Sequence, residues 1–408
     1  MTQPNAAADA IILGGGLVGS ALAVALDAHG LTAIVVDPAD PAVFLAAGFD
    51  GRASAIASAS HRMLAAIGVA DRLAGKGCPI RAIRVSDGLA PGKLDFEASE
   101  TDPLGVMYEN RALRTALFEA AREASGIDLR MQRSPVTVDR GATGVTVTLD
   151  DGAILTAPLV IAAEGRKSPM REAAGIRVAR WNYDHVAMIA AFNHPEPHGG
   201  IAFEIFYPAG PFALLPLIDD AGGHRSAIVW TVDAADAPGM LKLSDRAWLA
   251  EAEKRMGGFL GPLSNLSARS SYPLGFHHAG RITAERLALV GDAGHGIHPI
   301  AGQGLNLGLR DVATLVEVLV DGKRTGLDLG DRQLLGRYER WRGLDTFSVA
   351  FATDTLTRLF GVGGKTASAV RRFGISAVDR IPPLKDRFMA EARGESGDRP
   401  KLLLGELA

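Results

Sequence analysis

The residues of this chain that are best suited to hold a ligand are concentrated between Gly291 and Asn306. Glycines alternate there with an acid, two histidines, a proline and two amide side chains: Gly291, Asp292, Gly294, His295, Gly296, His298, Pro299, Gly302, Gln303, Gly304 and Asn306. Glycine lets the backbone approach a ligand closely, and the first N–H groups of a helix favour an electron-rich partner. We therefore expect Asp292 to accept a ligand hydroxyl and the amides near Gly304 to face a ligand carbonyl.

Two apolar patterns enclose this stretch and predict the elements that position it. Residues 286–290 (Arg-Leu-Ala-Leu-Val) have the length and composition of a fully buried strand. After the glycines, apolar side chains recur at helical spacing, at Leu305, Leu309, Val312, Val316 and Leu319. The sequence thus predicts a strand, a glycine-rich loop and a helix with one apolar face.

A second glycine-rich loop lies near the N-terminus. Residues 10–13 are typical of a buried strand, residues 20–30 of a helix of small apolar residues, and residues 31–36 of a second strand. Asp37 follows this strand, about 20 positions beyond the first glycine, where a carboxylate that binds ribose hydroxyls is expected. Strand, helix, strand and acid together predict a dinucleotide-binding unit.

The loop between the first strand and its helix contains the residues that would contact the dinucleotide. Gly14 allows the tight turn, Gly16 lets a pyrophosphate lie against the backbone, and Gly19 lets the helix pack on the strand. Leu17 and Val18 lie between them, at the start of the helix, and belong to the same predicted site. This pattern alone does not separate FAD from a nicotinamide cofactor.

The late segment, from Gly291 to Asp311, resembles the flavin-binding signature of the aromatic-ring flavoprotein monooxygenases, the p-hydroxybenzoate hydroxylase-like proteins. It is most similar to the ubiquinone-biosynthesis hydroxylases, whose pattern reads Gly-Asp-Ala-Ala-His, then Pro, then Ala-Gly-Gln-Gly-x-Asn-x-Gly and an Asp. This resemblance implies FAD, with its adenosine end on the first unit and its flavin ring on the late loop. Gly302, Gln303, Gly304, Leu305 and Asn306 are its cofactor-binding residues there.

Three further segments match the family at single positions. Arg52 matches an arginine that borders the flavin, and Asn110 and Arg111 match a helix start that meets the flavin ribityl chain. Glu164 and Gly165 stand where the family has Asp-Gly near the pyrophosphate, so the carboxylate here is one methylene longer. A surface arginine, and a helix capped by Asn110, are structural alternatives that the sequence leaves open.

The predicted fold class is α/β: a Rossmann-like FAD-binding domain, split in the sequence, with an antiparallel β-sheet substrate domain and a C-terminal helical segment. The FAD-binding domain comprises residues 1–185, of which about 76–105 contribute to the substrate side, and returns at 273–339. Residues 186–272 alternate apolar and polar positions and form the substrate domain. Residues 340–408 form the C-terminal helices.

The aromatic side chains in the predicted sheet allow two interpretations. Phe203, Phe206, Phe212 and Trp230 suit either an aromatic pocket or a core. The C-terminal segment is equally ambiguous, because its basic residues beside apolar ones suit a membrane surface or a helix packed on the flavin domain: Arg371, Arg372, Arg380, Lys385 and Arg387.

Composition narrows the function classes. A net charge of −3 does not favour a nucleic-acid partner. The one cysteine, Cys78, excludes a disulfide within the chain and fits a reducing compartment. Apolar runs stay below the roughly 18 residues of a spanning helix, so we expect a cytoplasmic protein with, at most, peripheral contact with the inner face of the membrane. His295 and His298 lack the partners of a metal site.

The chemistry follows from the resemblance. Reduced flavin adds oxygen at its C4a carbon, and the distal oxygen passes to an electron-rich phenol ring. O2 is a co-substrate, and NAD(P)H or a protein donor supplies the electrons. Pro299, which has no N–H, would shape the substrate-facing wall. His298 or His295 would either relay the phenol proton or order the loop by a hydrogen bond.

The implied substrate is an aromatic small molecule, a polyprenylated phenol or quinol intermediate of ubiquinone biosynthesis. Three alternatives remain open on the sequence alone: a hydroxylase of a soluble aromatic compound, a flavoprotein reductase, and a non-catalytic subunit of a ubiquinone-biosynthesis complex. The sequence leaves the oligomeric state, the ring position and the prenyl length undetermined.

Overall fold

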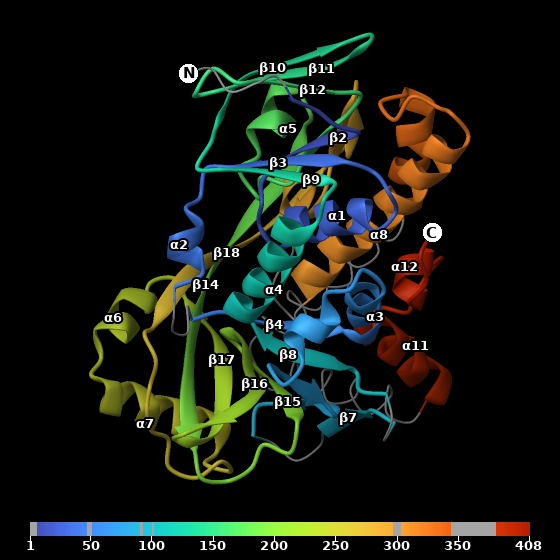
Figure 1. The fold of residues 1–408 in the computed structure, drawn as a ribbon. Coiled ribbons are helices and arrows are strands. Elements are labelled where there is room, and N and C mark those ends of the chain that lie inside the picture. The colour runs from blue at the N-terminus through green and yellow to red at the C-terminus, as the bar shows by residue number, and fades with distance from the viewer. Residues whose placement is uncertain (1–5, 47–50, 90–92, 100–101, 297–302, 344–380) are drawn as a thin grey trace.

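The structure, a computed structural model, describes residues 6–46, 51–89, 93–99, 102–296, 303–343 and 381–408. Helices gather around a parallel sheet in the upper part of Figure 1, and a larger sheet with two helices of its own occupies the lower part. Strands that are far apart in the sequence are neighbours in both sheets. The glycine-rich segments predicted to bind the cofactor lie between these two parts.

The upper sheet has six strands in the order β19-β20-β13-β2-β3-β9. Their bounds are β19 Thr283–Ala284, β20 Leu287–Leu289, β13 Val160–Ala162, β2 Ala10–Leu13, β3 Ala33–Asp37 and β9 Ile127–Met131. All neighbours from β20 to β9 are parallel, and only β19 is antiparallel. The late strand β20 therefore returns beside β13, as a sequence-split Rossmann-like domain requires.

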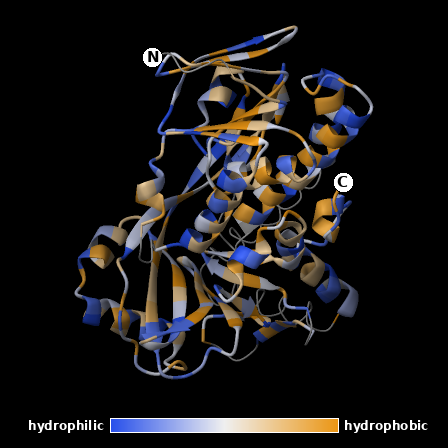
Figure 2. Cartoon of the chain, in the orientation of Figure 1, coloured by the Kyte–Doolittle hydropathy of each residue, from blue (hydrophilic) through white to orange (hydrophobic). Residues whose placement is uncertain are grey.

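Helices of this part are α1 Leu17–Asp27, α3 Ser58–Ala66, α4 Asn110–Glu123, α5 Pro169–Ala173, α8 Gln303–Arg324 and a helix over residues 332–343. The sheet is apolar along its length in Figure 2, and β2, β13 and β20 are completely buried. A four-stranded sheet covers one end, in the order β1-β12-β11-β10, with β1 Ala6–Ala7, β12 Ile154–Ala157, β11 Gly144–Leu149 and β10 Pro135–Gly141. β10 and β11 are an antiparallel pair, in register from Thr137 and Thr148 to Gly141 and Gly144.

The lower sheet has eight strands in the order β21-β18-β14-β17-β16-β15-β6-β7. The bounds are β21 His295–Gly296, β18 Ser270–Ala279, β14 Val178–His194, β17 Gly223–Asp233, β16 Gly210–Asp220, β15 Ile201–Tyr207, β6 Ala82–Asp87 and β7 Lys93–Glu97. It is antiparallel except for β15 and β6, which run parallel. β14 crosses the boundary expected at residue 186, and the domain boundaries themselves stay a prediction.

One face of the eight-stranded sheet packs against α6 Ala237–Lys242 and α7 Asp245–Met256. Phe212 and Trp230 lie in this core beside Trp248, so for these two residues the core reading is correct. The other face meets a three-stranded sheet, β4 Ala53–Ala57, β8 Gly105–Glu109 and β5 Gly77–Ile80 in the order β4-β8-β5. Phe206 packs on this second face.

The remaining elements are short or C-terminal: α2 Pro41–Phe44, η1 Ala70–Leu73, η2 Gly291–Ala293, α11 Pro382–Ala392 and α12 Lys401–Leu404. Residues 344–380 of the predicted C-terminal helices lie outside the described residues, and with them the basic residues Arg371, Arg372 and Arg380. In the parts of the chain that the structure describes, every helix is too short or too polar to cross a bilayer.

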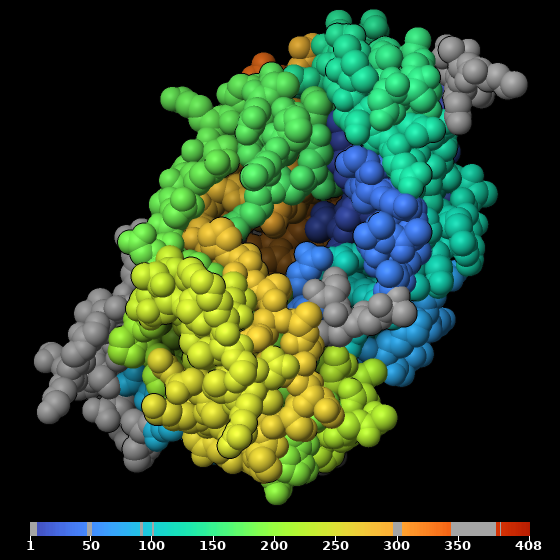
Figure 3. Space-filling model, turned by 90° about the vertical axis from the view of Figure 1, so that its left-hand side faces the viewer, coloured from blue at the N-terminus to red at the C-terminus, as the bar shows by residue number. Residues whose placement is uncertain are grey.

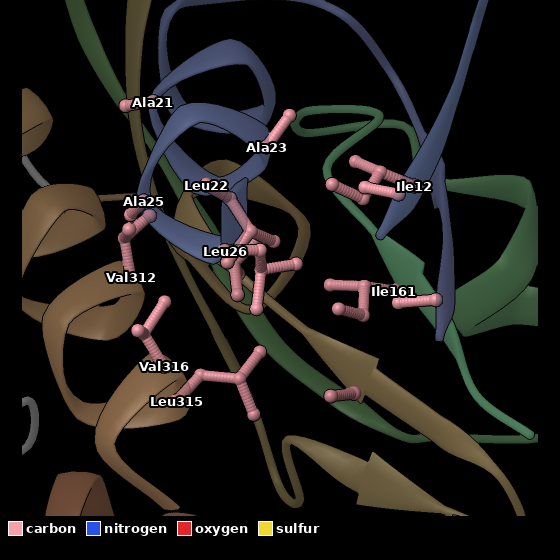
Figure 4. Packing of buried hydrophobic residues seen from close by; sticks show 14 of the residues in the cluster. Ile12, Ala21, Leu22, Ala23, Ala25, Leu26, Ile161, Val312, Leu315 and Val316 are labelled. Carbon is pink, nitrogen blue, oxygen red and sulfur yellow. The ribbon is translucent and has the colours of Figure 1, made fainter. Parts of the chain in front are cut away.

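Packing of α1 against α8 joins the two glycine-rich segments. Figure 4 shows Leu22, Ala25 and Leu26 of α1 facing Val312 and Leu315 of α8. At the N-terminal ends of both helices Val18 fills the space between Gly291 and Gly308, and a methyl group built on Gly308 would lie 2.7 Å from Val18 Cγ2. Only glycine at position 308 allows this approach.

This close approach makes Gly308→Ala destabilising. We expect a loss of about 1–3 kcal/mol in the free energy of unfolding, because the added methyl overpacks the contact with Val18. Gly239→Ala in α6 is the matched control, since its methyl meets no atom within 4 Å and should leave stability unchanged or slightly higher. Denaturant unfolding of the two variants checks this, and equal stabilities would contradict the packing argument.

Candidate functional site

A deep hollow separates the two parts of the molecule. In Figure 3 its floor shows dark blue atoms of the N-terminal unit beside brown atoms of the α8 region. A pocket of about 170 Å³ lies at the first glycine loop, lined by Gly15, Gly16, Leu17, Ser20, Asp37, Ala39, Phe44, Arg114, Leu117 and Phe118. The two predicted binding segments therefore share one groove.

The first glycine loop has the geometry that an elongated phosphate ligand needs. A methyl group on Gly19 would lie 1.9 Å from the Gly14 carbonyl oxygen, so α1 begins in direct backbone contact with the loop. Beside Gly16 the space is open to 4 Å. A ligand can thus approach the backbone at Gly16, at the N-terminus of α1, where free N–H groups favour an anion.

Asp37 stands at the end of β3, as predicted. Its Oδ2 accepts from the Gly15 N–H at 2.6 Å and its Oδ1 from the Ala39 N–H at 2.7 Å. Each carboxylate oxygen keeps a lone pair after one such bond, so a ribose hydroxyl can still donate to it. The two backbone bonds hold the carboxylate against the pocket wall.

The second binding segment is built around the start of α8 at Gln303. Gln303, Gly304, Leu305 and Asn306 occupy its first turn, where backbone N–H groups lack intrahelical acceptors and the helix dipole favours negative charge. The Asn306 side chain is buried and has a structural role: Oδ1 accepts from Ala57 N at 2.9 Å and Nδ2 donates to Ala55 O at 2.8 Å. Asn306 therefore joins α8 to β4, and its backbone is the part left to face a ligand.

A buried carboxylate, Asp311, fixes the glycine-rich turn onto α8. Its Oδ2 accepts from the Gly291 N–H at 2.8 Å and from His295 Nε2 at 2.6 Å, while Oδ1 accepts from Arg342 Nε at 2.6 Å. Burial alone would raise the pKa of Asp311, but the charges and hydrogen bonds of His295 and Arg342 outweigh it and lower that pKa. His295 thus orders the loop, one of the two roles considered for it.

Asp292 directly follows Gly291 in the turn that Asp311 holds, but its environment differs from that of Asp311. Its side chain is exposed, yet the surrounding protein raises its pKa, which places it on the wall of a concave surface. Its backbone carbonyl accepts from His277 Nε2 at 2.8 Å, so the turn is held from β18. Among the described residues the Asp292 carboxylate makes no hydrogen bond, and it is available for a ligand hydroxyl.

Two arginines after β13 hold the same turn from the other side. Arg171 is fully buried and donates to the Ala293 and Arg166 carbonyl oxygens, both at 2.8 Å. Arg166 donates to the Gly275 carbonyl oxygen at 2.6 Å. The loop that begins at Glu164 is thereby fixed to η2 and β18.

The Glu164 carboxylate binds groups of its own loop. Its Oε2 accepts from Ser168 Oγ at 2.6 Å and from the Met170 N–H at 3.2 Å, at the start of α5. Burial raises the pKa of Glu164, and these bonds oppose the rise. Gly165 beside it has open space, which suits a close backbone approach. Cofactor binding by either residue stays a prediction.

Around β4 the structure corrects one expectation. Asn110 is not the cap of α4: Glu109 is the residue before the helix, and the Asn110 side chain instead accepts from Ser54 Oγ at 2.6 Å. The Asn110 N–H donates to the Arg52 carbonyl oxygen at 3.0 Å, so these two predicted residues are neighbours. Arg111 Nε donates to the Ala46 carbonyl oxygen at 2.8 Å.

Three predicted residues, His298, Pro299 and Gly302, lie outside the described residues. Their roles stay predictions. Of the remaining predicted residues, Gly16, Leu17 and Asp37 line the first pocket, and Gln303 to Asn306 form the first turn of α8. Val18 links these two groups through Gly291 and Gly308. This arrangement fits FAD, because the open glycine loop, the acid at the end of β3 and the first turn of α8 border one groove.

Comparison with known proteins settles the family. A family model described as FAD binding domain matches residues 7–343. The chain is 44% identical to ubiquinone hydroxylase UbiL of Rhodospirillum rubrum, over 98% of this chain and 93% of that protein. It is 34% identical to 3-demethoxyubiquinol 3-hydroxylase of Escherichia coli, over 96% and 99%. It belongs to the ubiquinone-biosynthesis hydroxylase family.

The fold is also similar to that of solved flavoprotein monooxygenases. The solved structure of p-nitrophenol 4-monooxygenase PnpA from Pseudomonas putida superposes with a TM-score of 0.78 at 18% identity, over 97% of this chain and 100% of that one. Membership confirms the predicted fold class, the FAD cofactor and the enzyme class of FAD-dependent monooxygenase. The individual site residues rest on the geometry described above.

The sequence did not identify several residues that fix the binding turn in place. Arg342 and His277 have no glycine-rich or motif context, and only the fold brings them to Asp311 and Asp292. Arg171 and Asp311 do stand in the family pattern, which was the one available signal for them. Their role is to fix the binding turn in place.

Asp292→Ala should lose FAD while the apoprotein keeps its fold. The carboxylate is exposed and makes no described hydrogen bond, so its removal costs the apoprotein little. Because bound cofactor stabilises only the folded state, the holoprotein should lose the stabilisation that added FAD gives the wild type. Absorbance of bound flavin and thermal melts with and without FAD measure this. Unchanged flavin content would refute the role of Asp292.

Asp311→Asn should destabilise the protein at pH 7 by about 3–5 kcal/mol, because it removes the buried carboxylate charge to which Arg342 donates at 2.6 Å. The pKa of Asp311 is lowered on folding, so its contribution is present above the ordinary value of 3.8 and disappears as the pH falls through the lower folded value. The difference in the free energy of unfolding between Asp311→Asn and the wild type should therefore become smaller only at acidic pH.

Asp128→Asn is the matched control, because Asp128 forms an ion pair with Arg130 while its side chain remains 40% exposed. Exposed pairs contribute about 0–1 kcal/mol. Denaturant unfolding at several pH values measures both variants. A stable Asp311→Asn protein at pH 7 would contradict the assignment of Asp311 as the residue that fixes the turn.

Proposed function

We propose that this chain hydroxylates the aromatic ring of a polyprenylated phenol or quinol intermediate of ubiquinone biosynthesis. The observation that carries the proposal is the near full-length identity of 44% to a ubiquinone hydroxylase, on a groove that joins both FAD-binding segments. O2 supplies one oxygen atom to the ring and one to water. Two electrons come from NAD(P)H or from a protein donor.

FAD supplies the chemistry that the protein itself lacks, by activating O2 for transfer to an electron-rich ring. The residues of this chain hold and orient the reactants. The N–H groups in the first turn of α8 have no intrahelical acceptor, and they would stabilise negative charge on the pyrimidine end of the reduced ring. Asn306 keeps that turn in place through its two bonds to β4.

Exclusion of water is the second task of the protein. The face of the eight-stranded sheet that packs on β4, β8 and β5 is mostly apolar, with Phe206, Leu215 and Leu217 among its members. An apolar wall at this position suits a prenylated ring and keeps water from the reactive oxygen. We propose that Pro299, the first predicted catalytic residue, completes this wall and that His298 orders the loop beside it by a hydrogen bond.

A polyprenylated substrate is hydrophobic and dissolves in membranes. The enzyme must therefore contact a membrane or other proteins of the pathway to receive it. We propose peripheral contact through α11. Phe388, 40% exposed, and Ile381, 47% exposed, lie on α11 and the residue before it, with Arg387 and Lys385 on the same helix. Apolar and basic side chains together favour an anionic lipid surface.

Deletion of the gene tests the function. Cells should accumulate a quinone precursor that lacks one ring oxygen, and mass spectrometry identifies it. Wild-type protein should restore the missing oxygen, Gly239→Ala should do the same, and Asp292→Ala should not. A deletion strain without any accumulated precursor would remove the ubiquinone assignment.

A further inference from the structure

Among the described residues, one glutamate without a partner lies on the face of the eight-stranded sheet that packs on the three-stranded sheet. Glu204 is on β15, between Ala202 and Phe206, and both of these belong to the cluster between the eight-stranded and three-stranded sheets. Phe203 and Ile205 pack in the other cluster, against the helices. Since side chains alternate along a strand, Glu204 points to the three-stranded sheet.

Neighbouring strands confirm this direction. Glu204 is in register with Val85 of β6 and with Ala213 of β16, and Val85 packs into the same inter-sheet cluster. None of these neighbours can pair with a carboxylate. The in-register neighbours of Glu204 on both adjoining strands are therefore apolar.

The face that carries Glu204 connects to the flavin end of the groove. Its cluster includes Ala53 and Ala55 of β4. Ala55 and Ala57 of β4 bind the side chain of Asn306 at the start of α8. The sheet face, β4 and the flavin-facing turn of α8 are thus successive layers in direct contact.

Two properties of Glu204 point to a ligand. Burial raises the pKa of Glu204 to about 8, and no ion pair or hydrogen bond contributes to that shift. Although the side chain is surrounded by protein, part of it stays accessible, which requires a space beside it. A buried carboxyl without a partner is costly, and such groups cluster at functional sites.

Other ionisable groups on the surrounding elements are engaged or remain neutral near pH 7. Asp87 of β6 has an interaction of its own. Burial raises the pKa of the Cys78 thiol on β5 to about 11, so the thiol is uncharged near neutral pH. Glu109 of β8 pairs with Arg225 of β17. On α11, the residue that packs into this cluster is Met389, which is apolar.

We propose that Glu204 binds the ring hydroxyl of the aromatic substrate and accepts its proton during hydroxylation. This inference rests on the proposed function. The O–H bond of the phenol breaks, its electron pair stays on the phenol oxygen, and the proton forms an O–H bond on Glu204. The more electron-rich ring then accepts oxygen, and Glu204 returns the proton when the oxygenated ring carbon loses its own hydrogen.

Glu204→Gln tests the proposal in the FAD-loaded enzyme with a phenol that carries one prenyl side chain. In the wild type, kcat/KM should rise with pH up to about 8, where Glu204 becomes a carboxylate. Glutamine has the same shape but cannot accept the proton, so the rise should disappear and kcat should fall about 100-fold. FAD content and thermal stability should remain those of the wild type.

Two matched variants separate proton transfer from packing. Glu97→Gln removes an exposed carboxylate from the same sheet and should change nothing. Ala213→Val fills space beside Glu204 and should raise KM while the pH dependence of kcat/KM persists.

The outcomes distinguish this inference from the proposed function. Wild-type enzyme that yields no hydroxylated phenol would overturn both. Wild-type activity with an unchanged rate and pH profile in Glu204→Gln would overturn the inference alone. Loss of FAD or of folding in Glu204→Gln would overturn it as well, because Glu204 is assigned no part in holding the cofactor or the fold.

Discussion

Contact between the N-terminal ends of α1 and α8 is the constraint on which the site depends. Val18 occupies the space between Gly291 and Gly308, and neither glycine has a side chain to keep the helices apart. Two segments separated by more than half the chain thereby border one groove. FAD is long enough to need both, so a fold that failed to close this contact would present two incomplete binding sites.

The buried network around Asp311 fixes the position of the turn at Gly291 relative to α8. One carboxylate binds the turn after β20, a histidine of β21 and an arginine of the helix over residues 332–343. Removing any one partner would leave a charge or a polar group buried without compensation, which is why such a network specifies a single arrangement. Asp292, one residue beyond Gly291, is left exposed by this arrangement, and its binding of the cofactor stays a prediction.

Much of the fold and part of the site could be predicted from the sequence, because local patterns determine them. The strand before Gly14, the acid at the end of β3 and the helix that begins at Gln303 each follow from periodicity and glycine spacing. Membership in the family then explains why both glycine-rich loops serve one cofactor.

Long-range contacts could not be predicted. Asn110 has the residue type of a helix cap, yet Ser54 of a neighbouring strand binds its side chain. Arg342 and His277 have no sequence signal for their roles, because only the tertiary fold brings them to the binding turn. In the sequence, Glu204 is an ordinary polar residue of a strand. Only the packing of the two sheets shows that, among the described residues, its carboxyl group is buried without an ion pair or hydrogen bond.

The most direct test of the account is a crystal structure of the holoprotein at a resolution that places FAD. The account predicts the adenosine end beside Gly16 and Asp37, the flavin ring at the first turn of α8, and Asp292 bonded to a hydroxyl between them. An FAD whose ring lies away from α8, or whose adenosine end leaves the pocket at Gly16, would contradict it.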